Sequence, residues 1–380
     1  MPEDTHPSTH PPLPPTTEDD RVSWLRLLRS RRVGPATFHR LISEHGTAQA
    51  ALAALPEVAR AADVTDYTPC PTGVAEAELR AGHAAGAVML TCADANYPKA
   101  LRDLSDAPPV LWVMGDMAVL DRPVIALVGA RNASSLGTRM ARSLAADLSE
   151  QGFTIVSGLA RGVDTAAHLA SLKGGTVAVM AGGVDVIYPA ENTTLASDIL
   201  KTGLRLSEQP IGLIPQARHF PSRNRLISGL AHAVVVVEAA AKSGSLITAR
   251  TALDQGREVL AVPGHPIDAR ASGCNMLIRD GATLVRSAAD VIEALPKNKP
   301  KETQAEMSLD TTPEPTGRTP RDTTALHQQI LQRLGPSPLA EDQLIRDLGA
   351  PARSVAPVLV DLELDGQITR QPGGLLSLAR

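Results

Sequence analysis

The sequence predicts an α/β fold: a doubly wound parallel sheet with a small helical domain before it and a further small domain after it. Strand-like and helix-like patterns alternate over about 170 residues in the centre of the chain, which is typical of repeated βαβ units. The apolar run at 233–237 has no polar position, so both of its faces must be covered, as in a parallel sheet. The length of 380 residues fits two or three domains.

Residues 1–20 are predicted to be a disordered tail, because they contain six prolines and five acids with almost nothing apolar. From 21 to 86 the apolar residues recur at helical spacing, and a Gly-Pro pair at 34–35 separates two short amphipathic helices. We expect a small all-α domain of the SAM or helix-hairpin-helix kind. Six arginines and no acid lie between Arg21 and Ser43. They indicate either a hairpin that contacts phosphates or an interaction domain with a solvated basic face, and both remain open.

The sheet domain is expected from 87 to 296. Two strands, 88–98 and 110–116, lead into it, and a clear strand signal follows at 124–130. Later strands are predicted at 153–157, 176–181, 204–208, 234–237, 258–262 and 283–285. Helices are predicted at 138–150 and 164–172, after Glu191, near Asn224, from Ser245, near Asn275, and in a last segment that ends near Leu295.

Glycine, serine and arginine gather where the predicted strands end. Five such loops lie at 129–134, 157–162, 182–183, 208–225 and 243–245. Ligands of doubly wound sheets lie beyond the carboxyl ends of the strands, and glycine N–H groups together with helix N-termini suit phosphate oxygens. The segment 201–257 carries eight basic and three acidic residues, although the whole chain has a formal net charge of -4. We therefore predict an anionic ligand at this edge.

Three common nucleotide or hydrolase sites are not supported. The first loop, GARNASSLG, lacks the G-x-G-x-x-G pattern, and the second strand ends in Ser157-Gly158 where a dinucleotide site needs an acid. The sequence contains neither G-x-x-x-x-G-K-[ST] nor G-x-S-x-G, which argues against a P-loop ATPase and a simple hydrolase.

Two pairs of ionisable residues allow an enzymatic interpretation, but each has a simpler one. Asp164 and His168 could share a metal, yet a helix-start aspartate and a packed histidine explain the same spacing. Glu208 and Glu238 could pair for acid–base work, whereas we expect each to anchor an arginine of its own loop. We predict no catalytic residue, no metal and no cofactor.

The cysteines and the N-terminus bear on location. Cys70, Cys92 and Cys274 are odd in number and far apart, so neither a disulfide framework nor a zinc site is supported. The N-terminus has prolines and acids where a signal peptide needs a basic start, and no apolar run is long enough to span a membrane. We expect a soluble, cytoplasmic protein.

Eight motifs, in order and in register, resemble one family. They are VGAR, SGLARGVD, IYPAEN, SEQP, FPSRNRLISGL, VVEAAAKSGSLITA, AVPG and GCNMLIRDGA, and they span about Tyr97 to Ala282. This pattern resembles the DNA-processing protein A family, DprA, also called Smf. The resemblance implies an extended Rossmann-like domain that binds single-stranded DNA without sequence preference, protects incoming DNA, forms homodimers, and loads the RecA recombinase in natural transformation and recombination. It implies no catalytic activity.

The resemblance also assigns residues to a strand-binding pocket. Those that the motifs carry are Arg131, Arg161, Arg223, Asn224, Arg225, Ser243, Gly244, Ser245 and Thr248. Neighbouring loop residues complete the expected site: Gly129, Ser134, Ser157, Gly158 and Lys242. Phe220 is expected either to stack on a base or to pack under its loop.

The C-terminal part is predicted to be a linker at 297–321 followed by a winged-helix domain at 322–380. Three amphipathic helices precede a hairpin with Gly373-Gly374 at its turn. The domain carries five arginines and seven acids, and its recognition helix is acidic. We therefore expect a protein-interaction or regulatory domain.

An enzyme is the alternative function. Rossmann-like relatives of the family include nucleotide phosphoribohydrolases, whose P-G-G-x-G-T-x-x-E motif supplies an arginine/glutamate pair. This chain has SGSLIT in the corresponding place, with no glutamate after it, which argues against hydrolysis.

Overall fold

The computed structural model describes residues 14–295, 320–335, 338–371 and 375–379. The chain divides into two compact units, Met1–Lys297 and Asn298–Arg380. The first unit contains a nine-stranded sheet and the second a three-stranded sheet.

Four helices begin the first unit: α1 (Glu18–Arg29), α2 (Pro35–His45), α3 (Ala48–Ala61) and α4 (Thr72–Ala84). The expected Gly-Pro turn joins α1 to α2, with Gly34 as the N-cap and Pro35 as the first helical residue. α1 begins inside the predicted tail, so that part of the prediction is wrong. The Thr17 side chain accepts from the N–H of Asp20, and the Asp20 carboxylate accepts from the N–H of Thr17, which caps the helix there. Residues 1–13 of the tail lie outside the described residues.

The nine-stranded sheet has the order β1-β2-β6-β5-β4-β3-β7-β8-β9. Its strands are β1 (Val88–Thr91), β2 (Val110–Gly115), β3 (Val124–Val128), β4 (Thr154–Ser157), β5 (Thr176–Val179), β6 (Leu204–Ser207), β7 (Ala233–Val236), β8 (Glu258–Ala261) and β9 (Thr283–Leu284). The strands β3 to β9 are parallel, which confirms the doubly wound sheet. β1 and β2 extend it with antiparallel pairing to each other and to β6. The winding reverses between β3 and β7, where doubly wound folds place their ligands.

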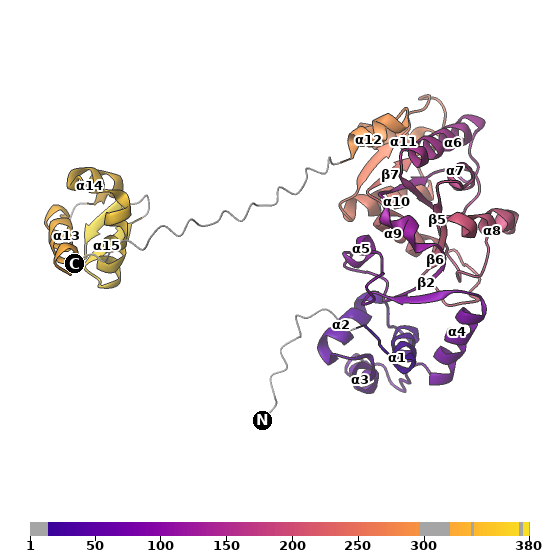
Figure 1. The fold of residues 1–380 in the computed structure, drawn as a ribbon, viewed down its shortest axis with the longest axis horizontal. Helices are drawn as coiled ribbons and strands as arrows, with labels where there is room; N and C mark the ends of the chain where they lie inside the picture. The colour runs from indigo at the N-terminus through magenta and orange to yellow at the C-terminus, as the bar shows by residue number, and fades with distance from the viewer. Residues whose placement is uncertain (1–13, 296–319, 336–337, 372–374, 380) are drawn as a thin grey trace. The chain divides into compact units, whose positions relative to one another are not determined.

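Helices cover both faces of this sheet (Figure 1). They are α5 (Lys99–Arg102), α6 (Ser135–Glu150), α7 (Val163–Ser171), α8 (Thr193–Thr202), α9 (His219–Leu230), α10 (Gly244–Asp254), α11 (Ser272–Arg279) and α12 (Ala288–Ala294). Two short 3₁₀ helices, η1 (Met117–Asp121) and η2 (Ala190–Asn192), lie in the connections.

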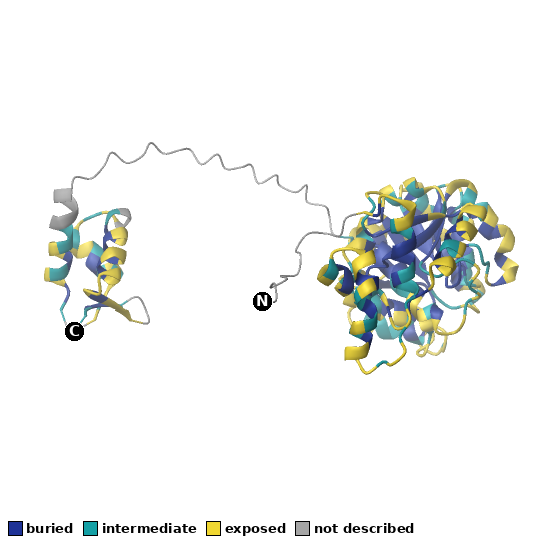
Figure 2. Ribbon diagram, turned by 90° about the horizontal axis from the view of Figure 1, so that it is seen from below, coloured by how far each residue is buried: buried dark blue, intermediate teal, exposed yellow. Residues whose placement is uncertain are grey.

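Side chains of β3 alternate between two hydrophobic cores, as the two-residue period of a strand requires. Ile125 and Leu127 share a core with residues of α6, α7 and α12. Val124, Ala126 and Val128 share the other core with α9 and α10 and with the N-terminal helices, so those helices belong to the same compact unit. Figure 2 shows the strands as a buried layer under exposed helical surfaces.

The segment FPSRNR forms helix and not the predicted loop. α9 begins at His219, so Phe220 to Arg225 lie in its first two turns. The buried side of this helix is apolar and packs in the core through Leu226, Ile227 and Leu230. The same helix includes both arginines of the segment.

The second unit has the expected winged-helix elements. They are α13 (Pro320–Arg333), α14 (Glu341–Leu348) and α15 (Ala352–Leu364), with strands β10 (Leu339–Ala340), β11 (Ile368–Gln371) and β12 (Leu375–Leu378). β11 and β12 form the predicted antiparallel hairpin, whose turn at 372–374 lies outside the described residues. Residues 296–319 of the predicted linker also lie outside them, and α13 already begins at Pro320. Within the described residues, no helix is both long and apolar enough to cross a membrane.

Candidate nucleic-acid interface

A pocket of about 940 Å³ opens where the winding of the sheet reverses. We call it the main pocket. Its walls come from the ends of β3 and β7, from the starts of α9 and α10, and from the β6–α9 and β8–α11 loops. Four basic residues line it, Arg131, Arg223, Lys242 and Arg270, with Asp164 as the single acidic lining residue. The charge concentration inferred from the sequence thus lies at the expected edge of the sheet.

Arg131 and two aromatic rings form the wall shared with a second pocket. The guanidinium carbon of Arg131 lies 4.7 Å from the centre of the Phe220 ring, and the Tyr188 ring lies 5.8 Å from that centre. Arg131 is exposed, and no carboxylate among the described residues pairs with it. The second pocket, of about 320 Å³, is lined by these three residues together with Gly158 and Arg161, among others. A free cation therefore lies against an aromatic surface that is open to solvent.

Arg223 holds the floor of the main pocket. It is buried, and its Nη1 donates to the carbonyls of Gly158 at 2.5 Å and Val179 at 2.6 Å. Burial lowers its pKa to about 10, with the Asp164 carboxylate opposing that shift. A side chain at position 158 would overlap the guanidinium, which explains the glycine there. Arg223 therefore ties α9 to the ends of β4 and β5. The two carbonyls occupy its Nη1 donor, which is then not available to a ligand.

The Asp164 carboxylate accepts hydrogen bonds from backbone N–H groups that the sequence analysis expected to bind phosphate. It accepts from the N–H groups of Gly158 at 3.1 Å and Ala160 at 3.2 Å. Burial raises the pKa of Asp164, and Arg223 counteracts that rise. His168 is fully buried, with its Nδ1 2.9 Å from the hydroxyl of Thr176. The helix-start aspartate and the packed histidine are thus confirmed, and no metal-ligating cluster occurs in the part of the chain that the structure describes.

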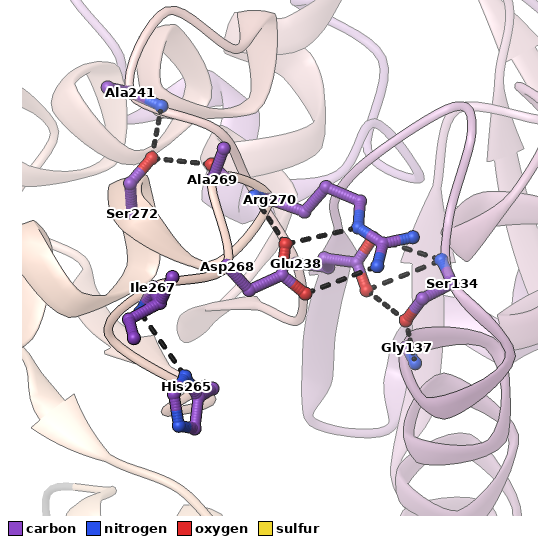
Figure 3. Close-up of polar contacts among 10 residues, drawn as sticks. All are labelled: Ser134, Gly137, Glu238, Ala241, His265, Ile267, Asp268, Ala269, Arg270 and Ser272. Carbon is purple, nitrogen blue, oxygen red and sulfur yellow. Dashed lines mark hydrogen bonds and ion pairs between the residues drawn. The ribbon is translucent and has the colours of Figure 1, made fainter.

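Glu238 fixes the loop that carries Arg131 (Figure 3). Its carbonyl accepts from the N–H of Ala130 at 2.7 Å, and its carboxylate accepts from both the N–H and the hydroxyl of Ser134. A side chain at Gly137 would overlap this carboxylate. The expectation that Glu238 anchors an arginine is wrong, because the capping serine of α6 takes its oxygens. The expectation for Glu208 is confirmed, because its carboxylate pairs with Arg225.

The start of α10 forms the opposite wall. Ser243 caps the helix by accepting from the N–H of Ser245, and the two hydroxyls lie 2.7 Å apart. Lys242 is exposed just before the cap, and within the described residues it makes no ion pair. The helix N-terminus and the lysine together place positive potential beside the main pocket.

Most of the predicted residues meet at the two pockets. Those that line the main pocket are Gly129, Arg131, Phe220, Arg223, Asn224, Lys242, Ser243, Gly244, Ser245 and Thr248. Gly158 and Arg161 line the second pocket, and Arg161 pairs there with Glu191 at 3.0 Å.

Three predicted residues lie elsewhere. Ser134 caps α6 behind the loop, and Ser157 is fully buried, with its hydroxyl donating to the carbonyl of Leu127. Arg225 points to the opposite side of α9, where it lines a separate pocket next to the N-terminal helices and pairs with Glu208 and Asp106. Neither Ser157 nor Arg225 is available to a ligand of the main pocket.

Two exposed residues at the pockets were not predicted. Tyr188 is 49% exposed and lies against Phe220; the scarcity of aromatic residues in the sequence draws attention to it, but no motif assigns it to the site. Arg270 lines the main pocket and pairs with Asp268 at 3.2 Å (Figure 3). It lies between two motifs, and no pattern in the sequence marks it.

Comparison with known families identifies the family to which the chain belongs. A family model described as DNA recombination-mediator protein A matches residues 88–296. The chain belongs to this family. Models of the DprA-like N-terminal HHH domain and of the DprA winged helix domain match residues 18–81 and 314–374. The resemblance drawn from the eight motifs is therefore confirmed, as are the helix-hairpin-helix and winged-helix assignments.

Relatives share much of the chain. Protein Smf of Escherichia coli (strain K12) is 39% identical over 290 residues, which cover 75% of this chain and 75% of that protein. DNA processing protein DprA of Bacillus subtilis (strain 168) is 46% identical over 211 residues, which cover 55% of this chain and 71% of that protein.

Two solved structures are similar in fold. The X-ray structure of DNA processing protein A from Streptococcus pneumoniae matches with a TM-score of 0.56 at 33% identity, over 73% of this chain and 93% of that one. A structure that reports the single-stranded DNA binding mode of DNA processing protein A from Helicobacter pylori matches with a TM-score of 0.51 at 32% identity. That match covers 55% of this chain and 94% of the other.

Proposed function

We propose that this protein binds single-stranded DNA without sequence preference, with the strand held in the main pocket. The observation that carries the proposal is the Arg131 guanidinium stacked on Phe220 at 4.7 Å, beside Lys242 and the N-terminus of α10, with neither cation in an ion pair among the described residues. Arginine, lysine and a helix N-terminus suit phosphate oxygens, and an exposed aromatic ring suits the face of a base. The combination favours a polynucleotide over a simple anion.

A single strand fits this site better than a duplex. Bases in a duplex are stacked on each other, so they offer no free face to Phe220 and Tyr188. The available charged donors belong to flexible side chains, which suit phosphates at any position along a strand. Binding of single-stranded DNA by the Helicobacter pylori relative supports the same function here.

The proposal is tested with a labelled oligo-dT and a labelled duplex of equal length. We expect the anisotropy of oligo-dT to rise at lower protein concentration than that of the duplex, and we expect dT, dA and mixed sequences to bind alike. Stronger binding of the duplex, or selection of one sequence, would contradict the proposal.

We extend the proposal to the family's role in transformation and recombination: the protein protects incoming strands, forms a homodimer through the Rossmann-like domain, and loads RecA in the cytoplasm. Family membership supports these functions. In a homodimer, the main pockets of the two protomers could bind the same strand, which would raise the avidity well above the affinity of one pocket. Light scattering of the free chain tests the dimer. RecA filament formation on protein-coated single strands, with and without this chain, tests loading.

The enzyme alternative is tested on the same preparation. We propose that the protein does no catalysis, because the segment 243–248 offers serines, a glycine and a threonine but no glutamate for sugar chemistry. Incubation with nucleoside monophosphates should release no free base. Base release that depends on Arg131 would favour a phosphoribohydrolase.

A further inference from the structure

The recognition helix of the winged-helix unit, α15, carries an apolar stripe on the side away from its core. At about 100° per residue, Pro357, Val360 and Leu364 fall opposite the buried Val358 and Leu362. Val360 is 48% exposed and Leu364 is 81% exposed. A helix in a small soluble unit normally turns polar residues toward solvent on this side, so we define these three exposed residues as the apolar stripe.

Acidic residues border the stripe. Asp361 lies on one side of it, Glu363 lies on the other, and Asp365 follows at the end of the helix, all of them exposed. From 354 to 365 the sequence has no lysine, arginine or histidine. From 354 to 365, the exposed surface of this helix is therefore apolar in its centre and negative at its edges.

This surface does not suit duplex DNA. A winged helix that reads a duplex places its recognition helix in the major groove, between two phosphate strands, and here the carboxylates of α15 would repel those strands. Arg370 of β11 offers no compensation, because its guanidinium pairs with Glu341 and with Glu363 at 3.4 Å. Arg370 is thus committed to holding the hairpin against α14 and α15.

We infer that the apolar stripe of α15 is a docking site for a basic amphipathic helix of another protein. Residues at i, i+3 and i+7 form one helix face, which packs against the apolar face of a second helix. Lysine or arginine residues beside the partner's apolar face would pair with the carboxylates on both sides. A second copy of this helix would bring like charges together, which disfavours self-association through the stripe. The inference does not depend on DNA binding by the first unit.

The probe for the test is a labelled synthetic helix of about 15 residues, with leucines along one face and lysines beside them. A peptide of the same composition in shuffled order is its control. We expect the full-length chain to bind the first peptide and not the second. Leu364→Ser should weaken binding by about tenfold, because it removes one buried leucine from the contact. Asp361→Asn should weaken binding and reduce its dependence on salt.

Leu253→Ser is the matched control variant. Leu253 is also a leucine with most of its side chain exposed, at 59%, but it lies on α10 in the other unit, so its replacement should leave peptide binding unchanged. Thermal unfolding checks that each variant is folded, and Asp361→Asn keeps the test open if Leu364→Ser is not.

Four results would overturn the inference. Equal binding of the two peptides, or wild-type affinity in both Leu364→Ser and Asp361→Asn, would show that the stripe is not the docking site. Duplex DNA binding that these substitutions alter would make α15 a DNA-contacting helix. A change in the sedimentation mass of the free chain on Leu364→Ser would assign the stripe to contact between copies.

Discussion

Replacement of Arg131 by alanine tests, at a single position, whether basic side chains of the pockets bind the phosphates of the DNA strand. Four basic residues reach solvent at the two pockets: Arg131, Arg161, Lys242 and Arg270. If each neutralises one phosphate, the logarithm of affinity should fall against the logarithm of salt concentration with a slope of roughly 3, at about 0.7 per contact. Without Arg131 the slope should be about 2.

The affinity itself should fall by about 10- to 100-fold, the typical effect of one lost charge-assisted contact. The loss should be the same for dT, dA and mixed oligomers, because the proposal has Arg131, which stacks on Phe220, bind a phosphate and no base edge. Anisotropy titrations at several salt concentrations give both quantities.

Arg80→Ala is the matched control for this substitution. Its side chain is 69% exposed on α4, in a weak pair with Glu76 at 3.8 Å, and it does not line either pocket. It removes the same charge without altering the site, so its slope should equal that of the wild type. A loss confined to one sequence in Arg131→Ala, or an unchanged slope, would refute the reasoning.

The remaining predictions concern the residues that hold the site. Arg225→Ala should cost about 3 kcal/mol in the free energy of unfolding, because it leaves the largely buried Glu208 carboxylate without its partner, yet the folded fraction should keep the wild-type salt slope. A reduced slope with unchanged stability would place Arg225 at the DNA. Gly158→Ala should lower both stability and affinity, because the added carbon overlaps the guanidinium of Arg223. Gly73→Ala, which meets open space in helix α4, should leave affinity unchanged and should not lower stability. A Gly158→Ala variant as stable as the wild type would contradict this packing. His168 is neutral in the fold, since burial lowers its pKa to about 3, but in the unfolded chain it takes a proton below about 6.5. Stability should therefore fall as pH drops from 7 to 4.5, by about 2–3 kcal/mol from this residue, and denaturant titrations should show a flatter pH dependence in His168→Gln. Equal pH dependence of the two proteins would exclude His168 as the cause.

The sequence was sufficient to predict the sheet and the edge at which the candidate site lies. Continuous apolar runs such as 233–237 can form only strands covered on both faces, and glycine-rich loops after such strands must lie together at one edge. This geometry places Arg131 and Lys242 at the same edge, because each follows a central strand, whereas their assignment to a strand-binding pocket came from the family resemblance.

The direction of individual side chains could not be predicted in the same way. Arg223 and Arg225 are two residues apart, so on a helix they point to different sides, and only the helical start at His219 decides which one faces the main pocket. A loop would have allowed both arginines to reach the same ligand. The capture of Gly158 and Ala160 N–H groups by Asp164 likewise depends on a local turn that residue spacing does not reveal.

Arg270 shows a further limit of motif-based reasoning. It lies in the loop between β8 and α11, outside every motif, and it reaches the main pocket only because β8 lies next to β7 in the sheet. Strand order therefore contributes residues to the site that strand-by-strand analysis of the sequence cannot assign.

The most direct measurement is the affinity of the wild-type protein for a labelled oligo-dT at two salt concentrations, with a duplex of the same length beside it. Four phosphate contacts predict a loss of about 50-fold when salt rises from about 50 to about 200 mM, and tighter binding of the single strand at both concentrations. Binding of oligo-dT that does not respond to salt, or absence of binding at the lower concentration, would contradict the proposal that these pockets hold a DNA strand by its phosphates.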